Sequence, residues 1–184
     1  MPIVKFKVAD IMSLPDNYAD GCDMVFTDPP WEDRMVKFFD TASKKVGGLS
    51  QSSGIDGILN KLFKMSPKVP MFIEYSIQGH ERVIHHAERN GHVFNRTIRS
   101  TQTNGKPYCI IQFNSDMPLV LDSKGFDILH HAIEHHRPKR IFEPFAGHGV
   151  HAFIMHSKGC EVVAAELNKG RAAKLMAKFG LDEA

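Results

Sequence analysis

The chain has 184 residues, 42% of them hydrophobic and 24% charged, which is typical of a globular protein that buries a sizeable core in one domain. Its formal net charge of +2 is too small to indicate a nucleic-acid-binding protein by itself, and no apolar run approaches the length of a membrane span. We therefore predict one domain over residues 1–184, located in the cytoplasm and with no membrane partner. The unclustered Cys22, Cys109 and Cys160 are predicted to be buried free thiols in a reducing compartment.

The N-terminal part of the chain predicts two strands, each followed by an acid. Residues 4–8 alternate like a strand and do not form a signal peptide, and a short helical turn at 11–14 follows Asp10. The apolar run 23–27 is the second strand, and it leads directly into Asp28-Pro29-Pro30-Trp31.

This Asp-Pro-Pro-Trp run is suited to holding one planar amino group. The carboxylate of Asp28 and the carbonyl of Pro29 can accept both hydrogens of an exocyclic –NH2. The ring of each proline fixes its own φ, and Pro30 also restricts Pro29, so the carbonyl is held rigidly. Trp31 offers a flat face on which a base can stack. The competing interpretation is a strand that simply ends in a proline turn.

The middle of the chain predicts helices and strands with no chemical motif. We expect a helix over 32–42 with Met35, Phe38 and Phe39 as its apolar stripe, and a mobile loop over 44–57, which is rich in Gly, Ser and Lys. A helix over 58–65, a strand over 69–75 and a helix over 80–90, closed by Gly91, follow. Residues 32–68 are a candidate target-recognition segment. Its lysines could contact phosphates or form a solvated face: Lys37, Lys44, Lys45, Lys61, Lys64 and Lys68.

Residues 92–102 and 106–114 predict a β-hairpin, because the β-rich runs flank Thr103-Asn104-Gly105. A helix over 123–136, with Ser123 as a possible cap, carries four histidines: His130, His131, His135 and His136. Their spacing does not match His-Glu-x-x-His, so we predict a polar helix face and no metal site. His85, His86 and His151 receive the same interpretation.

The second chemical motif runs from Glu143 through Pro144, Phe145, Ala146, Gly147 and His148 to Gly149. A strand over 141–143 enters this turn, and a helix over 150–157, a strand over 162–166 and a closing helix over 169–179 follow. Gly147 and Gly149 allow a tight turn and close approach to a ligand, and Glu166 lies about twenty residues further on, where an acid can hold ribose hydroxyls. The third glycine of a dinucleotide site and the Gly-Lys-Ser/Thr of an NTP site are both missing, which favours a nucleoside-type cofactor.

The alternation of elements predicts an α/β fold: a parallel sheet with helices on both faces and an antiparallel hairpin. The last strand should lie beside the first and bring Glu166 close to Asp10. Ligands bind at the C-terminal ends of the strands in such sheets, and Asp10, Asp28, Glu143 and Glu166 all fall at or near those ends.

The two motifs together resemble those of the amino-group DNA methyltransferases that use S-adenosylmethionine. The catalytic motif precedes the glycine motif here, which is similar to the circularly permuted β class of that family. Residues 8–20 also resemble the family's first motif region. The resemblance implies a Rossmann-like methyltransferase fold with a mostly parallel seven-stranded sheet. His148, the pair Val150-His151, and Glu143 in place of the commoner aspartate depart from the usual pattern.

The resemblance also implies roles for individual residues. Asp10 and Ile11 would contact the adenine of the cofactor, and Glu166 its ribose hydroxyls. The methionine and ribose portion would be surrounded by Glu143, Phe145, Gly147 and Gly149. The target base would be held by Asp28, Pro29, Pro30 and Trp31, and Asp28 would also face the cofactor.

The implied activity is methyl transfer to N6 of adenine in DNA, after the base has been flipped out of the duplex. Several alternatives remain open: an RNA adenine-N6 methyltransferase, which also carries Trp after Asp-Pro-Pro, a cytosine-N4 DNA methyltransferase, and a non-catalytic nucleic-acid-binding partner subunit. A protein-glutamine methyltransferase is disfavoured by the motif order. A homodimer or a separate specificity subunit is a possible partner.

Overall fold

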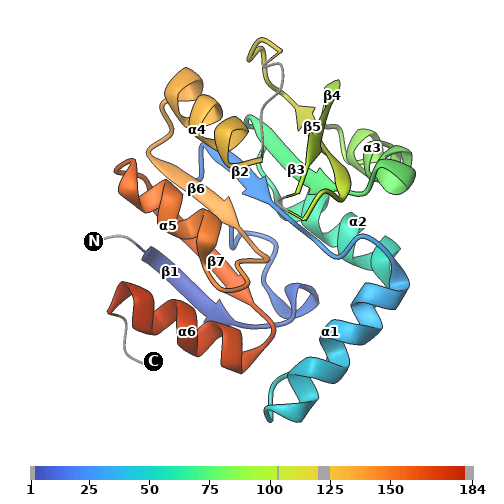
Figure 1. The fold of residues 1–184 in the computed structure, drawn as a ribbon, viewed down its shortest axis with the longest axis vertical. Helices are drawn as coiled ribbons and strands as arrows, with labels where there is room; N and C mark the ends of the chain where they lie inside the picture. The colour runs from blue at the N-terminus through green and yellow to red at the C-terminus, as the bar shows by residue number, and fades with distance from the viewer. Residues whose placement is uncertain (1–2, 103, 120–124, 181–184) are drawn as a thin grey trace.

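The computed structural model describes residues 3–102, 104–119 and 125–180. Among these residues seven strands form one sheet through the middle of the molecule (Figure 1). The strands are β1 (Ile3–Val8), β2 (Met24–Thr27), β3 (Met71–Tyr75), β4 (Phe94–Thr101), β5 (Pro107–Phe113), β6 (Arg140–Glu143) and β7 (Glu161–Glu166). Their order across the sheet is β1-β7-β6-β2-β3-β5-β4, and every pairing is parallel except the two that β5 makes. The predicted fold class is confirmed, including the last strand, β7, lying beside β1.

Helices cover both faces of the sheet, as predicted. They are α1 (Asp33–Lys45), α2 (Ile55–Met65), α3 (His80–Arg89), α4 (Gly125–His136), α5 (Val150–Ser157) and α6 (Lys169–Phe179), with short 3-10 turns at Ile11–Ser13 and Ile77–Gly79. Figure 1 shows α4, α5 and α6 on one face and α2 and α3 on the other. No helix in the described ranges combines the length and the apolar character needed to cross a bilayer.

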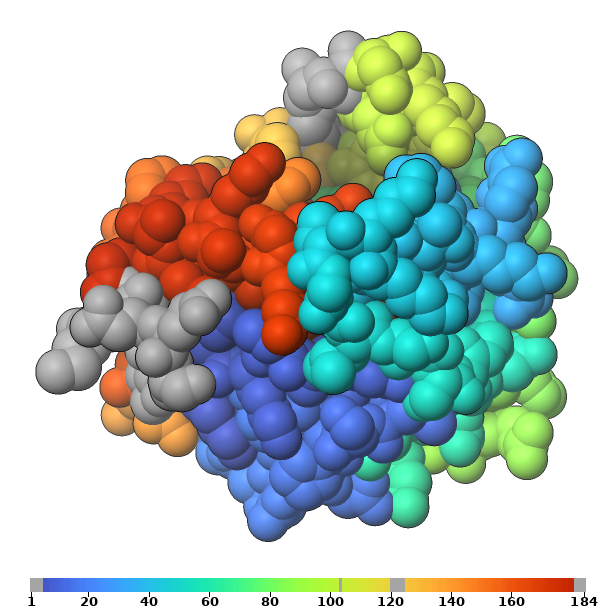
Figure 2. Space-filling view, turned by 90° about the horizontal axis from the view of Figure 1, so that it is seen from below, coloured from blue at the N-terminus to red at the C-terminus, as the bar shows by residue number. Residues whose placement is uncertain are grey.

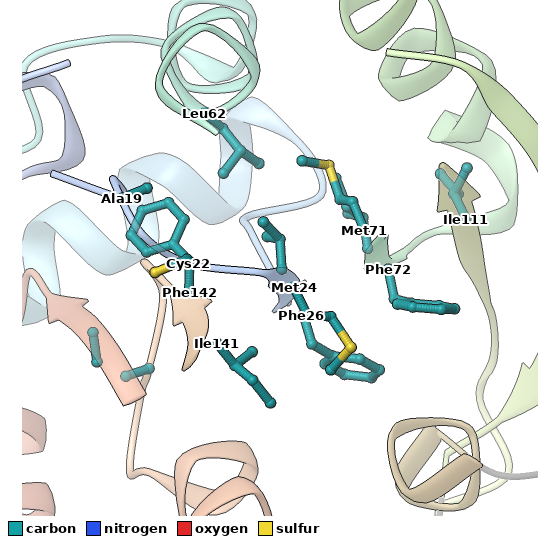
Figure 3. Packing of buried hydrophobic residues seen from close by; sticks show 14 of the residues in the cluster. Ala19, Cys22, Met24, Phe26, Leu62, Met71, Phe72, Ile111, Ile141 and Phe142 are labelled. Atoms are coloured by element: carbon teal, nitrogen blue, oxygen red, sulfur yellow. The ribbon is translucent and has the colours of Figure 1, made fainter. Parts of the chain in front are cut away.

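The core lies on both sides of the central strands. All residues of β2 and β3 are buried, because both faces of these central strands are covered, and the strands are apolar except at Thr27 and Glu74. Figure 3 shows Leu62 of α2 pointing toward one face of the sheet, and Phe26 of β2 lying beside Phe72 of β3 on the other, with ring centres 6.2 Å apart. Cys22, Cys109 and Cys160 are buried free thiols, as expected. This rigid layer fixes the strand ends that carry the acids.

The region between β2 and β3 differs from the sequence prediction. Helix α1 continues to Lys45 and α2 begins at Ile55, so both ends of the predicted loop over 44–57 are helical. The stripe predicted for α1 was wrong at Phe38, whose side chain is 63% exposed. The buried residues of α1 are Val36 and Ser43, while Met35 and Phe39 of the predicted stripe are partly buried.

The predicted hairpin is confirmed by the antiparallel pairing of β4 and β5, which runs from Phe94↔Phe113 to Thr101↔Pro107. Gly105 in the turn has φ +81°, which favours glycine. Thr103 of the predicted turn and Ser123, the predicted cap of α4, lie outside the described residues.

Candidate active site

The four acids predicted for one rim do lie at the C-terminal ends of neighbouring strands. Asp10 and Asp28 follow β1 and β2, and Glu143 and Glu166 are the last residues of β6 and β7. The strand order β1-β7-β6-β2 therefore places the four side by side. The backbone N–H of Ala9 donates to the carbonyl of Glu166 at 3.0 Å, so the predicted closeness of the first and last strands extends to the rim itself.

A cavity of about 140 Å³ opens at this rim. Five of the residues predicted to bind a cofactor line it: Ile11, Asp28, Phe145, Gly147 and Glu166. The other described residues that line it are Ala9, Pro30, Phe39, Gln51, Pro144, Leu167 and Arg171. Among the described residues, Asp10, Glu143 and Gly149 are not part of its wall.

Three segments far apart in the sequence meet beside this cavity. Figure 2 shows the blue N-terminal segment, the cyan segment that joins α1 to α2 and the red start of α6 next to one another on one face. The hydroxyl of Ser43 donates to the carbonyl of Leu167 at 3.2 Å, and the guanidinium of Arg171 lies 4.8 Å from the ring centre of Phe39. The cavity is thus closed on one side by α1, which the sequence did not assign to the cofactor site.

Glu166 fixes the glycine turn to the end of β7. Its Oε2 accepts a hydrogen bond from the backbone N–H of Gly147 at 2.8 Å, and its Oε1 accepts one from Asn168 at 2.8 Å. Burial raises the pKa of this carboxyl, and the two backbone donors oppose that effect. Each oxygen has a second lone pair, and Glu166 lines the first cavity, so its carboxylate is suited to accept hydrogen bonds from hydroxyls there.

Asp10 anchors the segment between α1 and α2 and does not reach the cavity. Its Oδ1 accepts from the side-chain amide of Gln51 at 2.7 Å and from the backbone of Met12 at 3.1 Å, and its Oδ2 accepts from the backbone N–H and the hydroxyl of Ser52. Gln51 lines the cavity in its place. No periodicity or motif in the sequence marked Gln51.

Gly149 occupies a position that only glycine suits. Its φ is +75°, and an added Cβ would lie 3.0 Å from Cγ of Leu175 in α6. Gly159 has φ +82° with no neighbouring atom within 4 Å among the described residues. We expect Gly149→Ala to lower the free energy of unfolding by about 2–3 kcal/mol and Gly159→Ala by about 1 kcal/mol, because only the first adds overpacking to backbone strain. Urea unfolding measures both, and equal losses would contradict the steric role of Leu175.

A second cavity, of about 270 Å³, lies on the other side of Asp28. Its wall comes from β3, the β4–β5 hairpin and the starts of α4 and α5: Asp28, Glu74, Thr101, Gln102, Asn104, Tyr108, Gly125, Phe126, Val150 and His151. Among the residues that the structure describes, Asp28 is the one that both walls share. The structure therefore brings two separate binding spaces to one carboxylate.

Trp31 holds Asp28 in place. The indole N–H donates to Oδ1 of Asp28 at 2.8 Å. The Trp31 side chain is only 7% exposed and is parallel to Tyr108, with ring centres 6.3 Å apart. Within the part of the chain that the structure describes, Tyr108 lines the second cavity and Trp31 lines neither. Stacking of a base on Trp31 stays a prediction, and Tyr108 is the aromatic ring at the cavity.

Desolvation by the surrounding rim and the charges of neighbouring acids raise the pKa of Asp28 to about 7, although the residue itself is open to the two cavities. Desolvation is the largest cause, and the negative charge of Glu74 is the next. The hydrogen bond from Trp31 and the charge of His151 act in the opposite direction. Asp28 therefore changes its charge near neutral pH, which is typical of groups that take part in chemistry.

Glu143 is the centre of a buried network beneath the two cavities. It is fully buried, and its Oε1 accepts from the hydroxyl of Thr27 at 2.6 Å and from the backbone N–H of Phe145 at 3.2 Å. Its Oε2 lies 3.2 Å from Nδ1 of His151. Glu143 thus joins the strand before Asp28 to the turn that lines the first cavity, and it acts on the cofactor site through the backbone.

His151 is held between two carboxylates. Its Nε2 lies 3.6 Å from Glu74, opposite the contact that Nδ1 makes with Glu143. Burial alone would lower the pKa of His151, but these two carboxylates raise it to about 10, so the ring is an imidazolium. The interpretation of His151 as part of a polar helix face was wrong, because a helical pattern does not show what packs against it.

One group within the described ranges could hold a metal ion: Asp116, His135 and His136. The hydroxyl oxygen of Ser115 already accepts from Gln112 and from the backbone of Met117, so its own proton is donated to Nε2 of His136 at 2.7 Å. Nδ1 of His136 then carries the ring proton and cannot ligate a metal. We keep the prediction of no metal site.

Most of the lysines considered for phosphate contact have partners. Lys44 pairs with Asp40 at 2.6 Å, and Lys61 and Lys64 pair with Asp16 at 2.6 and 2.8 Å. Lys68 donates to the carbonyl of Asn90. Such exposed pairs are weak and can be exchanged for phosphates. A phosphate-binding role for these lysines stays a prediction.

No family model matches the sequence, and no curated protein matches it either. Solved structures do resemble it. M1.HpyAVI in complex with SAM has a TM-score of 0.69 at 14% identity, over 96% of this chain and 99% of that chain. TTHA0409 from Thermus thermophilus, complexed with S-adenosyl-L-methionine, has a TM-score of 0.61 at 12% identity, over 96% and 94%. PvuII DNA methyltransferase (cytosine-N4-specific) has 0.60 at 10%, over 97% and 86%. At such identities the likeness shows the Rossmann-like fold alone.

Proposed function

We propose that this protein is an S-adenosylmethionine-dependent methyltransferase that modifies the exocyclic amino group of a base in DNA, with adenine N6 as its target. The observation that carries the proposal is that Asp28 lines both cavities. An amine in the second cavity and a methyl donor in the first would meet at the same carboxylate. The similar structures support this, because two of them hold S-adenosylmethionine and the PvuII enzyme is a DNA methyltransferase.

The residues of the first cavity suit each part of S-adenosylmethionine. Phe39, Phe145 and Ile11 are apolar neighbours for the adenine ring, with the amide of Gln51 for its polar edge. Glu166 accepts hydrogen bonds from the ribose hydroxyls, and Arg171 is a cationic partner for the methionine carboxylate. Bound here, the cofactor supplies a methyl group on a positively charged sulfur.

The residues around Asp28 position the amine. Its lone pair is delocalised into the base, so the nitrogen is a weak nucleophile until its geometry is fixed. Asp28 and the carbonyl of Pro29 accept its two hydrogens, and Trp31 holds Asp28 through the indole N–H. The lone pair is thereby directed toward the first cavity, and positioning and fixed dipoles provide most of the acceleration. In duplex DNA the base must first be flipped out, which costs a few kcal/mol.

Adenine is our choice of base because an acid occupies the first position of the Asp-Pro-Pro-Trp motif. Two acceptors for one amine would equally serve cytosine N4, and the PvuII enzyme makes that the first alternative. An adenine in RNA is the second alternative, because Trp31 follows Asp-Pro-Pro as it does in the RNA adenine-N6 methyltransferases. The segment over 32–68 is the proposed target-recognition part of one domain, with a second copy or a specificity subunit as a possible partner.

The deciding experiment is transfer of labelled methyl from S-adenosylmethionine to duplex DNA, single-stranded DNA and RNA, with the product nucleosides separated. N6-methyladenine in DNA supports the proposal. N4-methylcytosine would replace adenine by cytosine as the target base, and methylated RNA would replace DNA by RNA as the substrate. Cofactor binding without transfer to any polymer would indicate that a partner subunit is missing or that the substrate is another molecule. Absence of cofactor binding would overturn the proposal.

Glu166→Gln should weaken S-adenosylmethionine binding about tenfold or more, because charge-assisted hydrogen bonds to the ribose become neutral ones. The matched control is Glu161→Gln, at the opposite end of β7, where the side chain pairs with Arg140 at 2.7 Å. Isothermal titration calorimetry measures both affinities. Equal affinities for Glu166→Gln and the wild type would remove Glu166 from the ribose site.

A further inference from the structure

A fifth acid, Glu74, lies on the same rim. The register between β2 and β3 pairs Val25 with Met71, and Thr27 with Ile73. The next position on each strand is Asp28 and Glu74, so these two carboxyl groups are level with one another. Both line the second cavity, and the side chain of Glu74 is only 12% exposed. The sequence offered one signal, an acid near the end of an otherwise apolar strand, Met-Phe-Ile-Glu-Tyr.

The surroundings of Glu74 hold it in the cavity wall. Its Oε1 lies 3.6 Å from Nε2 of His151. An added Cβ on Gly125 would lie 2.4 Å from the same oxygen and 2.2 Å from the hydroxyl of Tyr108, so the start of α4 approaches this closely only because it is glycine. The ionisable groups around Glu74 are Asp28, His151 and Tyr108, with Glu143 behind His151.

These groups carry an excess of negative charge. Three carboxylates, Asp28, Glu74 and Glu143, face one imidazolium, that of His151. The negative charge of Glu143 and the positive charge of His151 balance each other in the interior. Asp28 and Glu74 remain as two acids on the wall of one cavity. Two acids that share a site repel one another, and the charge of Glu74 is one cause of the raised pKa of Asp28. A cavity with an excess of negative charge favours a bound group that becomes positively charged during the reaction.

We propose that Glu74 is a catalytic carboxylate that forms, together with Asp28, the acceptor for the proton that the methylated amine must lose. This inference rests on the proposed function. As the N–C bond forms from the nitrogen lone pair, the C–S bond breaks and its electrons remain on sulfur. The nitrogen is then –NH2⁺–CH3. One N–H bond breaks, its electron pair returns to nitrogen, and the proton passes to the Asp28–Glu74 pair and later to water.

The charge of Glu74 has a second, measurable effect. It is one of the causes that raise the pKa of Asp28 to about 7, next after burial. Asp28 must be ionised to act as a full acceptor for one amine hydrogen while the carbonyl of Pro29 accepts the other, so the rate of the wild type should rise with pH through about 7. This rise is the acid limb of the pH–rate profile. Removal of the Glu74 charge lowers the pKa of Asp28 and moves the acid limb to lower pH.

The test is single-turnover methyl transfer from pH 5.5 to 9 in wild type, Glu74→Gln and Glu74→Asp. Gln keeps the size of the side chain and an acceptor for His151. We expect Glu74→Gln to shift the acid limb down and to lower the plateau rate by about 10- to 100-fold, because the carboxylate no longer stabilises the positive charge that develops on nitrogen as the methyl group is transferred. Its S-adenosylmethionine affinity should stay within about twofold. Glu74→Asp should keep the acid limb near 7, and Glu81→Gln, on the exposed surface of α3, should match the wild type.

An unchanged acid limb and plateau rate in Glu74→Gln, with an active wild type, would overturn the role of Glu74 and leave the proposed function standing. A wild type that binds the cofactor but methylates no polymer would overturn both. Should Glu74→Gln fail to fold, Glu74→Asp decides: its carboxylate is one methylene shorter, so an undiminished plateau rate would contradict direct proton transfer.

Discussion

Asp28→Ala should lower the rate of methyl transfer by at least about a thousandfold while S-adenosylmethionine still binds. The substitution removes the carboxylate that both cavities share, and with it one of the two acceptors that orient the amine. Loss of one preorganised charge-stabilising group typically costs 10²–10³ in rate, and Asp28 also belongs to the proton-accepting pair. Single-turnover transfer of labelled methyl measures the effect, and calorimetry measures the cofactor affinity.

Two comparisons make the Asp28 result specific. Asp20→Ala removes an exposed acid ahead of the same strand, and its rate should equal that of the wild type. Asp28→Asn keeps the shape but directs either an amide N–H or a single neutral acceptor at the amine, so it should be nearly as slow as Asp28→Ala. Activity within tenfold of wild type in Asp28→Ala would mean that the chemistry takes place elsewhere.

Glu143→Ala should lower the free energy of unfolding by about 3–5 kcal/mol, the usual cost of removing one partner of a buried ion pair. It leaves the imidazolium of His151 with Glu74 alone, and it removes the acceptor for the Thr27 hydroxyl and the Phe145 N–H. The free energy of unfolding of a folded domain is only about 5–15 kcal/mol, so this loss would remove a large fraction of the stability of the variant. Urea denaturation measures the loss, and Glu161→Ala, which breaks an exposed pair with Arg140, should cost far less.

The same network predicts how stability changes with pH. The pKa of His151 is about 10 in the folded state and 6.5 ordinarily, so its contribution is complete below about 6.5 and is lost as pH rises to about 10. The pKa of Asp28 is raised from 3.8 to about 7, so this carboxyl also binds its proton more tightly in the folded state. Its contribution to the free energy of unfolding is therefore lost as pH rises from about 3.8 to about 7. Urea unfolding at pH 5, 7 and 9.5 should show stability falling throughout. A rise between pH 7 and 9.5 would contradict the buried imidazolium.

The local parts of the site were accessible from the sequence. Glu166 and Gly147 belong to a strand–turn–helix–strand unit whose spacing is diagnostic, and Asp28 is marked by the prolines after it. The two motifs depend on residues near one another in the chain. The alternation of strands and helices predicted the last strand beside the first, and the pairing of Val8 with Glu166 confirms it.

The parts that the sequence did not show depend on packing between distant segments. Gln51 reaches the first cavity because Asp10 holds its segment, and nothing within that segment indicates this contact. Glu74 and His151 face each other only after β3 and α5 come together beneath the hairpin. Their patterns alone are those of a buried strand and a short helix.

The shared wall at Asp28 also has a consequence for inhibitor design. Asp28 lines both cavities, so a molecule that extends past this carboxylate would reach from one cavity into the other. A bisubstrate ligand, in which an adenosine unit is tethered through an amine to a second heterocycle, would place its linking nitrogen at Asp28. Once one half is bound, the other half is held at a high effective concentration, so the tethered molecule gains affinity over either half without any new contact. A protonated linking amine would in addition meet the excess negative charge of this rim.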